Sequence, residues 1–220
     1  MNQEQFSINK NHRLYFGNNY CQLPLLSANE PMVEEYLEAL HRVIKCALEQ
    51  YGRVFAFRVD LHLPLSHGIE SCTIENSVLS RFLQSLKAKI AHGRMIAKLN
   101  GNQFHDTKLR YFWVREVGVQ GRPHFHLVIL LNGHAYNWLG NYQSPAGNMA
   151  NRVWEAWASA LGMHVDDARS LVHFPENPSY ILRRTDPDSF AAFFRRASYL
   201  CKARTKQYGA GHHGYGASRQ

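Results

Sequence analysis

The stretch His124-Phe125-His126-Leu127-Val128-Ile129-Leu130-Leu131 decides the fold of this chain. Its apolar run is typical of a buried strand. Side chains alternate between the two faces of a strand, so the two histidines point to the same face. A strand that is anchored in the core therefore presents two imidazoles side by side, and such a pair is suited to binding one divalent metal ion.

The preceding segment predicts a hairpin partner for this strand. A strand-like run over residues 108–117 is followed by a loop with glycines on either side of Gln120. In a hairpin centred on that residue, Glu116 lies opposite His124, and directly opposed residues share a face. A shift of one residue would move the carboxylate to the other face, so the register is itself part of the prediction.

One carboxylate and two imidazoles suit Mn²⁺, Co²⁺, Zn²⁺ or Fe²⁺ and hold Mg²⁺ less comfortably. Three protein ligands leave positions open for substrate oxygens, which suits catalysis better than structure. The alternative interpretation is a pair of polar side chains on a solvated sheet face. Other histidines have no comparable partners in the sequence and are interpreted as ordinary surface or core residues; they include His62, His134, His164 and His173.

The remaining elements follow from hydrophobic periodicity. Helices are predicted from Pro31 to about residue 51, over 74–90, over 149–161, and from Asp186 to beyond Lys202. A strand over residues 55–63 alternates in a way that indicates burial on one face, and residues 171–174 predict a short strand. Clustered strands with helices between and after them predict an α+β fold, with a largely antiparallel sheet, helices on one face and the other face open for a ligand.

Three regions are expected along the chain. Residues 1–30 are interpreted as an N-terminal arm that packs on the domain, and residues 31–206 as that domain. The Gly- and His-rich residues 207–220 are interpreted as a flexible tail.

Composition narrows the class of protein. The 220 residues carry a formal net charge of +8, which favours a polyanionic partner such as nucleic acid. Four scattered cysteines without a C-x-x-C pair argue against a zinc framework or a disulfide scaffold, and indicate reduced thiols in a cytosol. The polar start of the chain lacks the apolar stretch of a signal peptide, and no apolar run is long enough to span a membrane.

A second group of candidate residues lies near the C-terminal end. Tyr199 and Lys202 are three residues apart, so a helix presents both on one face. A tyrosine hydroxyl is a weak nucleophile at neutral pH and needs a nearby cation, or a metal that polarises the electrophile. Lys202 could stabilise the phenolate or hold a phosphate oxygen. The alternative is a helix that packs through its aromatic residues and exposes a cationic face.

Basic residues near these two groups are expected to contact a phosphate backbone. Four belong to the expected last helix, namely Arg195, Arg196, Arg204 and Lys206, and three are expected on the open sheet face, namely Arg58, Lys108 and Arg110.

Together these motifs resemble the HUH endonuclease superfamily, in particular its rolling-circle replication initiators. The name describes two histidines around a bulky hydrophobic residue, as in residues 124–126. The family's second motif is a tyrosine followed three residues later by lysine, on a helix that lies C-terminal to the histidine strand, as at Tyr199. An acidic residue on the preceding strand recurs as a third metal ligand, and Glu116 occupies that place. The strand around Asp60 matches the first motif only loosely.

The stretch over residues 121–131 also resembles replication proteins of filamentous phages (inoviruses) and the prophage YagK/YfjJ family. The resemblance covers roughly residues 50–206. Lys202 stands where some phage initiators carry a second tyrosine, so the chain resembles the single-tyrosine type.

This resemblance implies site-specific nicking and joining of single-stranded DNA at the origin of a phage or other mobile element. It implies that Tyr199 attacks the scissile phosphate to give a 5′-phosphotyrosine and a free 3′-OH, with Mg²⁺ or Mn²⁺ bound by Glu116, His124 and His126. Single-stranded or hairpin DNA would be the substrate, in a bacterial cytoplasm. The chain has no G-x-x-x-x-G-K-[ST] motif, so host helicase and polymerase are the expected partners.

Two other classes of function are compatible with these residues. The chain could be a DNA-binding regulator of a mobile element that has lost cleavage. It could also be a metal-dependent hydrolase that uses the metal site without a covalent intermediate on Tyr199.

Overall fold

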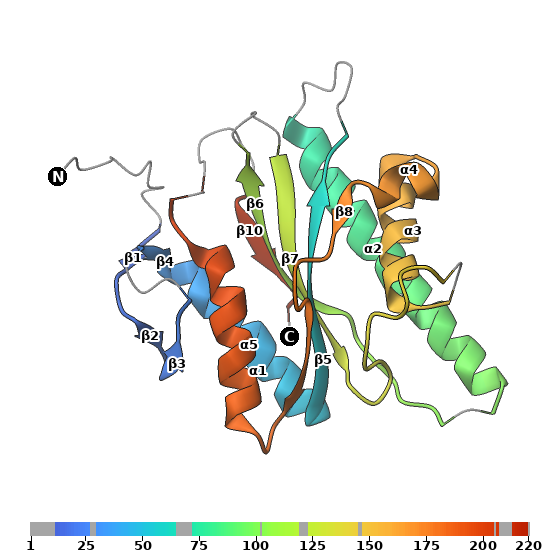
Figure 1. Ribbon diagram of the computed structural model, residues 1–220, viewed down its shortest axis with the longest axis horizontal. Helices are drawn as coiled ribbons and strands as arrows, with labels where there is room; N and C mark the ends of the chain where they lie inside the picture. Colours follow the sequence, from blue (N-terminus) through green and yellow to red (C-terminus); the bar gives the residue numbers. More distant parts are fainter. Residues whose placement is uncertain are drawn as a thin grey trace.

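The computed structural model describes residues 12–26, 30–64, 72–101, 103–118, 123–144, 147–204, 206 and 213–219. Its centre is a six-stranded sheet in the order β10-β6-β7-β5-β8, with β9 also paired to β5 (Figure 1). The pairings are all antiparallel, which confirms the predicted α+β class. The strands are β5 (Arg53–His62), β6 (Arg110–Val117), β7 (Pro123–Asn132), β8 (Val172–His173), β9 (Ser179–Arg183) and β10 (Tyr215–Ala217).

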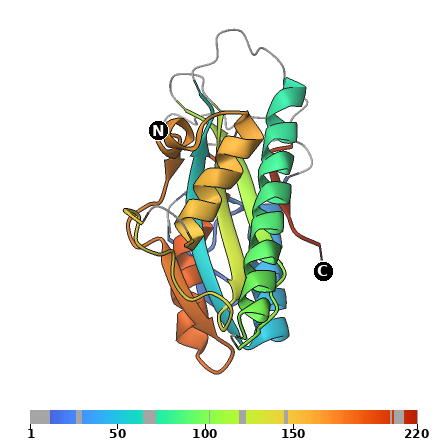
Figure 2. The same cartoon turned by 90° about the vertical axis from the view of Figure 1, so that its right-hand side faces the viewer.

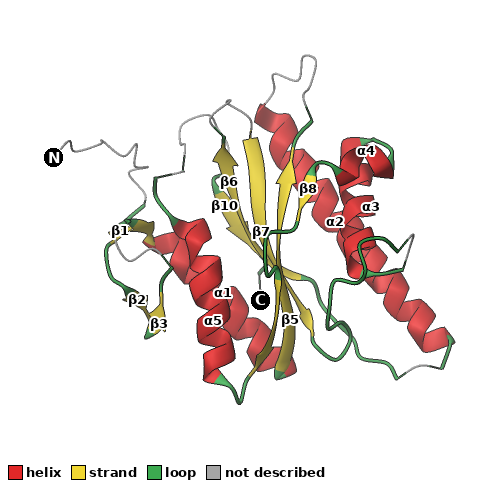
Figure 3. Ribbon diagram, viewed as in Figure 1, coloured by secondary structure: helices red, strands yellow, loops and turns green. Residues whose placement is uncertain are grey.

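Helices cover both faces of this sheet (Figures 1 and 3). They are α1 (Glu34–Tyr51), α2 (Cys72–Leu99), α3 (Met149–Leu161), α4 (Val165–Arg169) and α5 (Pro187–Ser198), and a 3₁₀ turn, η1 (Tyr199–Cys201), follows. One core layer lies between the sheet and α1 with α5, and the other between the sheet and α2 with α3. Figure 2 shows α2 and α3 side by side in front of the sheet.

The expectation of helices on one face only is therefore wrong, and the reason lies in the central strands. Along β5, Val54 and Ala56 belong to the α1 layer, whereas Phe55 and Phe57 belong to the α2 layer. Apolar side chains on both faces need cover on both sides. The predicted one-sided burial of this strand is wrong for the same reason, because its residues 54–61 are buried throughout.

The ends of the helices are set by capping residues. Asn148 begins α3 with a reciprocal capping box, and the Asp186 carboxylate accepts from Ser189 N at the start of α5. Helix α5 ends at Ser198, earlier than expected. Tyr199 therefore lies in the 3₁₀ turn, and Lys202 and the basic residues after it follow the turn instead of continuing the helix.

Both ends of the chain add to the α1 layer. In the N-terminal arm, β1 (Leu14–Tyr15) pairs with β4 (Met32–Val33), and β2 (Asn19–Tyr20) pairs with β3 (Leu23–Pro24). The expectation of a flexible tail over 207–220 is wrong for residues 215–217, which form β10 on the edge of the sheet. Residues 207–212 lie outside the described residues. No helix in the described parts of the chain is long and apolar enough to cross a membrane.

Candidate metal centre and tyrosine

The candidate site lies on the α1 face of the sheet, where β5 and β6 end, β7 begins and the apolar layer stops. The hairpin register matches the prediction, because Glu116 pairs with His124 and Val114 pairs with His126. Alternation then places all three candidate ligands on the face that Val114 shares with the α1 layer. The strands thus change from apolar to polar along one face as they leave the core.

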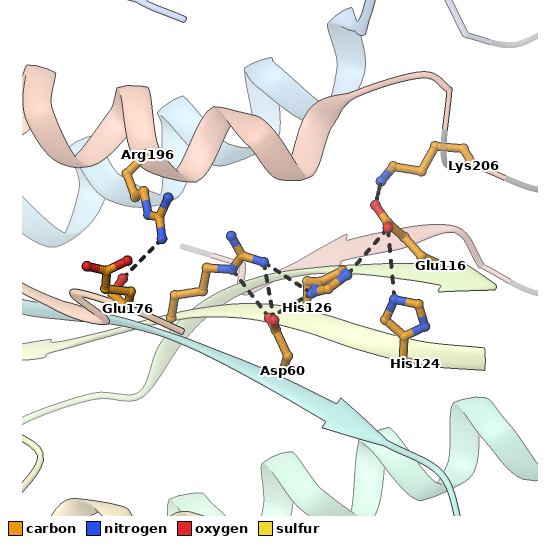
Figure 4. Close-up of polar contacts among 8 residues, drawn as sticks. Asp60, Glu116, His124, His126, Glu176, Arg196 and Lys206 are labelled. Carbon is orange, nitrogen blue, oxygen red and sulfur yellow. Dashed lines mark hydrogen bonds and ion pairs between the residues drawn. The ribbon is translucent and has the colours of Figure 1, made fainter. Parts of the chain in front are cut away.

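The three ligands converge closely enough to hold one ion (Figure 4). One ligand atom from each of Glu116, His124 and His126 lies within 4.8 Å of the others. Glu116 Oε2 is 3.4 Å from His126 Nε2 and 3.9 Å from His124 Nε2. Ligands bonded at about 2.1 Å to one ion lie about 3 Å apart, so small side-chain rotations bring this set to bonding distance.

Asp60 belongs to the candidate site by its contact with His126, and the ligand set predicted from the sequence does not include it. It lies on β5 opposite His126, and its Oδ1 is 2.6 Å from His126 Nδ1. A carboxylate on one ring nitrogen fixes the imidazole and leaves the other nitrogen for a metal ion, so Nε2 is directed at Glu116. Polar residues at alternate positions of an otherwise apolar strand, Arg58 and Asp60, were the available indication.

Hydrogen bonds and charge interactions within the candidate site shift the pKa values of His126, Asp60 and Glu116. Burial alone would lower the pKa of His126, but hydrogen bonds and charge from Asp60 and Glu116 outweigh it and raise that pKa. Burial likewise would raise the pKa of Asp60, yet His126 and Arg58 hold it below its usual value. The pKa of Glu116 also lies well below its ordinary range, because its neighbours His126 and Lys206 outweigh its burial.

Lys206 is buried beneath the site instead of exposed to a phosphate backbone. Its side chain is 1% exposed, and its Nζ donates to Glu116 Oε1. The two oxygens of Glu116 therefore have different neighbours, with Oε1 facing the ammonium and Oε2 facing the imidazoles. The expectation that Lys206 contacts DNA is wrong, because the chain turns inward after η1 and buries this residue.

Tyr199 lies at the edge of the same site. Tyr199 is exposed, and Lys202 Nζ lies 3.9 Å from the centre of its ring. Arg58 Cζ lies 5.7 Å from that centre, and Arg58 itself donates to Asp60 and has Nη2 3.3 Å from His126 Nδ1. Arg58 thus lies between the tyrosine and the histidine. Lys202 also forms an ion pair with Glu30 at 3.2 Å.

The other predicted DNA contacts are spread over the molecule. Arg110 is buried and bonds Gln50 of α1, six residues from Glu116 on β6, which is about 20 Å along a strand. Lys108 precedes that end of the strand, so the structure does not bring either residue to the site. Arg195 and Arg196 lie in the last turn of α5, where Arg196 donates to the Glu176 carbonyl, and Arg204 is exposed after η1.

His62 also lies closer to the site than its sequence context indicates. It pairs with His124 across β5 and β7, and the two rings stack with centroids 5.4 Å apart and planes at 18°. Burial lowers its pKa. The expectation that His62 has no partner comparable to those of the histidine pair is therefore wrong, since His62 extends the row of Glu116 and His124 across a third strand.

Comparisons with known proteins identify relatives along nearly the whole chain. The family model described as "YagK/YfjJ C-terminal domain" matches residues 18–218. The uncharacterized protein YagK of Escherichia coli (strain K12) is 33% identical over 193 residues, which cover 84% of this chain and 92% of YagK. The uncharacterized protein YfjJ of the same strain is 32% identical over 198 residues, with 85% and 95% covered. No solved structure matches this chain.

Proposed function

The chain belongs to the YagK/YfjJ C-terminal domain family, and we propose that it nicks and rejoins single-stranded DNA by metal-dependent transesterification on Tyr199. The observation that carries this proposal is the placement of an exposed tyrosine beside a Glu-His-His group, with Arg58 between them. A site that only binds DNA needs neither the ligand set nor an adjacent hydroxyl. The HUH-type motifs noted in the sequence support the same chemistry.

The donor set fits a divalent ion, because it offers one carboxylate oxygen and two imidazole nitrogens directed at one point. Mg²⁺ or Mn²⁺ held by Glu116, His124 and His126 would supply charge stabilisation for the phosphate in the transition state. Asp60 and Lys206 hold the ligands in place, the first by fixing His126 and the second through Glu116.

In the proposed step, Tyr199 Oη forms a bond to phosphorus while the bond from phosphorus to the 3′ oxygen breaks. The phenolic proton passes to water, and the departing 3′ oxygen takes a proton to become a free 3′-OH. Lys202 and Arg58 lie near the tyrosine ring and favour the negative charge that develops on its oxygen. The 5′-phosphotyrosine conserves the phosphodiester bond energy, so a second 3′-OH can reverse the step and join strands.

This chemistry fits the start of rolling-circle replication of a phage or other mobile element. The free 3′-OH can prime a polymerase, and unpaired or hairpin DNA at an origin exposes the scissile phosphate. Host helicase and polymerase are the proposed partners, in a bacterial cytoplasm. The net charge of +8 is consistent with a nucleic-acid substrate.

The test is incubation with single-stranded origin oligonucleotides and Mn²⁺ or Mg²⁺. A protein band that is shifted and survives denaturation is expected for the wild type, and Tyr199→Phe should abolish both the band and cleavage. Tyr142→Phe is the matched control, because Tyr142 is 41% exposed against 38% for Tyr199. Cleavage that persists in Tyr199→Phe would instead support a hydrolase that uses the ligand set alone.

One observation favours a second candidate, a DNA-binding regulator on the same fold. Lys206 already provides a positive charge beside Glu116, so the carboxylate is compensated without a metal ion. This alternative predicts DNA binding that neither a chelator nor Tyr199→Phe weakens, and no covalent adduct.

A further inference from the structure

A cavity of about 660 Å³ opens beside the candidate metal centre, where β5 ends and β7 begins, against α4 and the residues that flank this helix. His62 and Pro123 form its wall on the side of the site. His62 stacks on the ligand His124, and Pro123 precedes that ligand in the chain. The cavity therefore adjoins the candidate metal centre through one residue that stacks on a ligand and one that is bonded to the same ligand in the chain.

We propose that this cavity binds one unpaired DNA base next to the phosphate that is cut, and that it sets the base preference there. The identity of the ligand rests on the proposed function. A nucleotide whose phosphate lies at the metal centre has its base within about one backbone repeat of that phosphate. The ring centroid of His62, on the cavity wall, lies 5.4 Å from that of the ligand His124.

The composition of the cavity suits a base better than a phosphate. The described residues that line it include a carboxylate, Asp167, but no lysine or arginine. Among these described lining residues, a phosphate would meet the carboxylate of Asp167 and no lysine or arginine to compensate its charge. Leu63, Met163 and Leu171 offer apolar surface for the faces of a base, and His62 offers a ring on which it can stack.

The cavity is built on fixed backbone. His62 N donates to Leu171 O at 2.8 Å, and His62 O accepts from Trp157 Nε1 at 3.1 Å. These bonds tie the end of β5 to the segment after α4 and to α3. The wall is therefore positioned before DNA arrives, which lowers the entropy cost of binding.

The polar rim indicates which base fits. Asp167 and Ser170 belong to α4 and its end, and both line the cavity. A carboxylate can accept both adjacent donors of guanine, N1–H and N2–H, on its Watson–Crick edge. Thymine presents carbonyl oxygens on either side of its single donor and is repelled. We therefore expect guanine to be preferred over thymine.

The experiment is a binding selection with the full chain carrying Tyr199→Phe, so that the DNA stays intact. A randomised single-stranded DNA library is bound in the presence of Mn²⁺, and the retained strands are sequenced. Asp167→Ala removes the carboxylate, and Ser170→Phe fills the cavity. Asp166→Ala is the matched control, because Asp166 lies on the same helix, pairs with His164 and does not line the cavity.

At one position we expect guanine to be enriched over thymine by about tenfold, in line with a bidentate contact to a base. Asp167→Ala and Ser170→Phe should both lose that preference, whereas Asp166→Ala should keep it. An abasic residue at that position should weaken binding about tenfold in the Tyr199→Phe chain and have no further effect with Ser170→Phe.

Retention of the preference in both cavity variants would overturn the proposal, as would the lack of any preferred position in the parent chain. The covalent-adduct assay with intact Tyr199 tests the proposed function separately. A base preference that depends on the cavity, without any adduct, would support base binding in the cavity and contradict the proposed nicking. An adduct that forms with a base preference unchanged in the cavity variants would support nicking and contradict base binding in the cavity.

Discussion

At the scale of single residues, the orientation of His126 depends on Asp60. The 2.6 Å contact with Nδ1 fixes the ring, and Arg58 donates to the same carboxylate. Asp60→Asn should therefore lower the affinity for Mn²⁺ by about 10- to 100-fold, the usual effect of removing such a partner. Isothermal titration calorimetry measures this directly. Asp166→Asn is the control, and equal affinity in both variants would show that Asp60 does not position the ligand.

The ion pair between Lys206 and Glu116 makes a second prediction at this scale. Lys206→Met leaves the buried Glu116 carboxylate without this cation and should lower the free energy of unfolding by about 3–5 kcal/mol. Adding Glu116→Gln to that variant should recover part of the loss, because the charge is then gone as well. Urea unfolding of the two single variants and the double variant measures the coupling. Additive losses would contradict a direct pair.

At the scale of elements, β10 closes the edge of the sheet through an aromatic contact. The ring centroid of Tyr215 lies 4.2 Å from that of Tyr36 on α1. Strand β10 also pairs with β6, the strand that carries Glu116. Tyr215→Ala should lower the free energy of unfolding by about 2 kcal/mol. Phe16→Ala, at a residue that is 72% exposed, is the control. An equal, small loss in both would mean that β10 contributes little to the sheet.

The elements also show which information the sequence carries locally. The register of the β6–β7 hairpin could be predicted to the residue, because the two strands are adjacent in the chain and few residues separate them. The match of α3 to the predicted residues 149–161 has the same origin, since periodicity and the Asn148 cap are both local. Patterns within short stretches of the sequence were therefore enough to predict the candidate ligand set and most of the helices and strands.

The parts that could not be predicted depend on pairings between distant segments. Asp60 reaches His126 only because β5 lies beside β7, and Lys206 reaches Glu116 only because the chain turns inward after η1. Strand β10 depends on β6, about one hundred residues earlier. The alternation in β5 predicts burial on one face only, whereas Ala56, Arg58 and Asp60 on the other face are buried as well, beneath distant segments of the chain.

At the scale of the whole molecule, stability should depend on pH through the network around Asp60. The pKa of Asp60 is lowered in the folded state, so its contribution is present above its unfolded value of about 4 and is lost as pH falls. The pKa of His126 is raised, so its contribution is present below about 6.5 and is lost as pH rises through the folded value.

The opposite directions of these two pKa shifts define the pH range in which Asp60→Asn should differ most from the wild type in its free energy of unfolding. Asp60→Asn removes the contribution of Asp60 and the part of the His126 contribution that depends on Asp60, while Glu116 still acts on His126. The destabilisation should therefore be largest between about pH 4 and 6.5 and shrink on either side. Urea unfolding of wild type and variant from pH 3 to 9, without added metal, gives the difference. A destabilisation that does not change with pH would show that the pair contributes through packing instead of charge.

The hairpin that carries the candidate ligands has a consequence for inheritance and design. All three candidate ligands lie within residues 116–126, on two strands that are adjacent in the chain. A single short segment of sequence therefore encodes the whole candidate ligand set. Recombination or protein engineering could transfer this segment to another antiparallel sheet. The proposed nucleophile, Tyr199, lies far downstream in the sequence and would not be transferred with these strands. A sheet that received them would therefore gain the candidate ion-binding residues without the tyrosine.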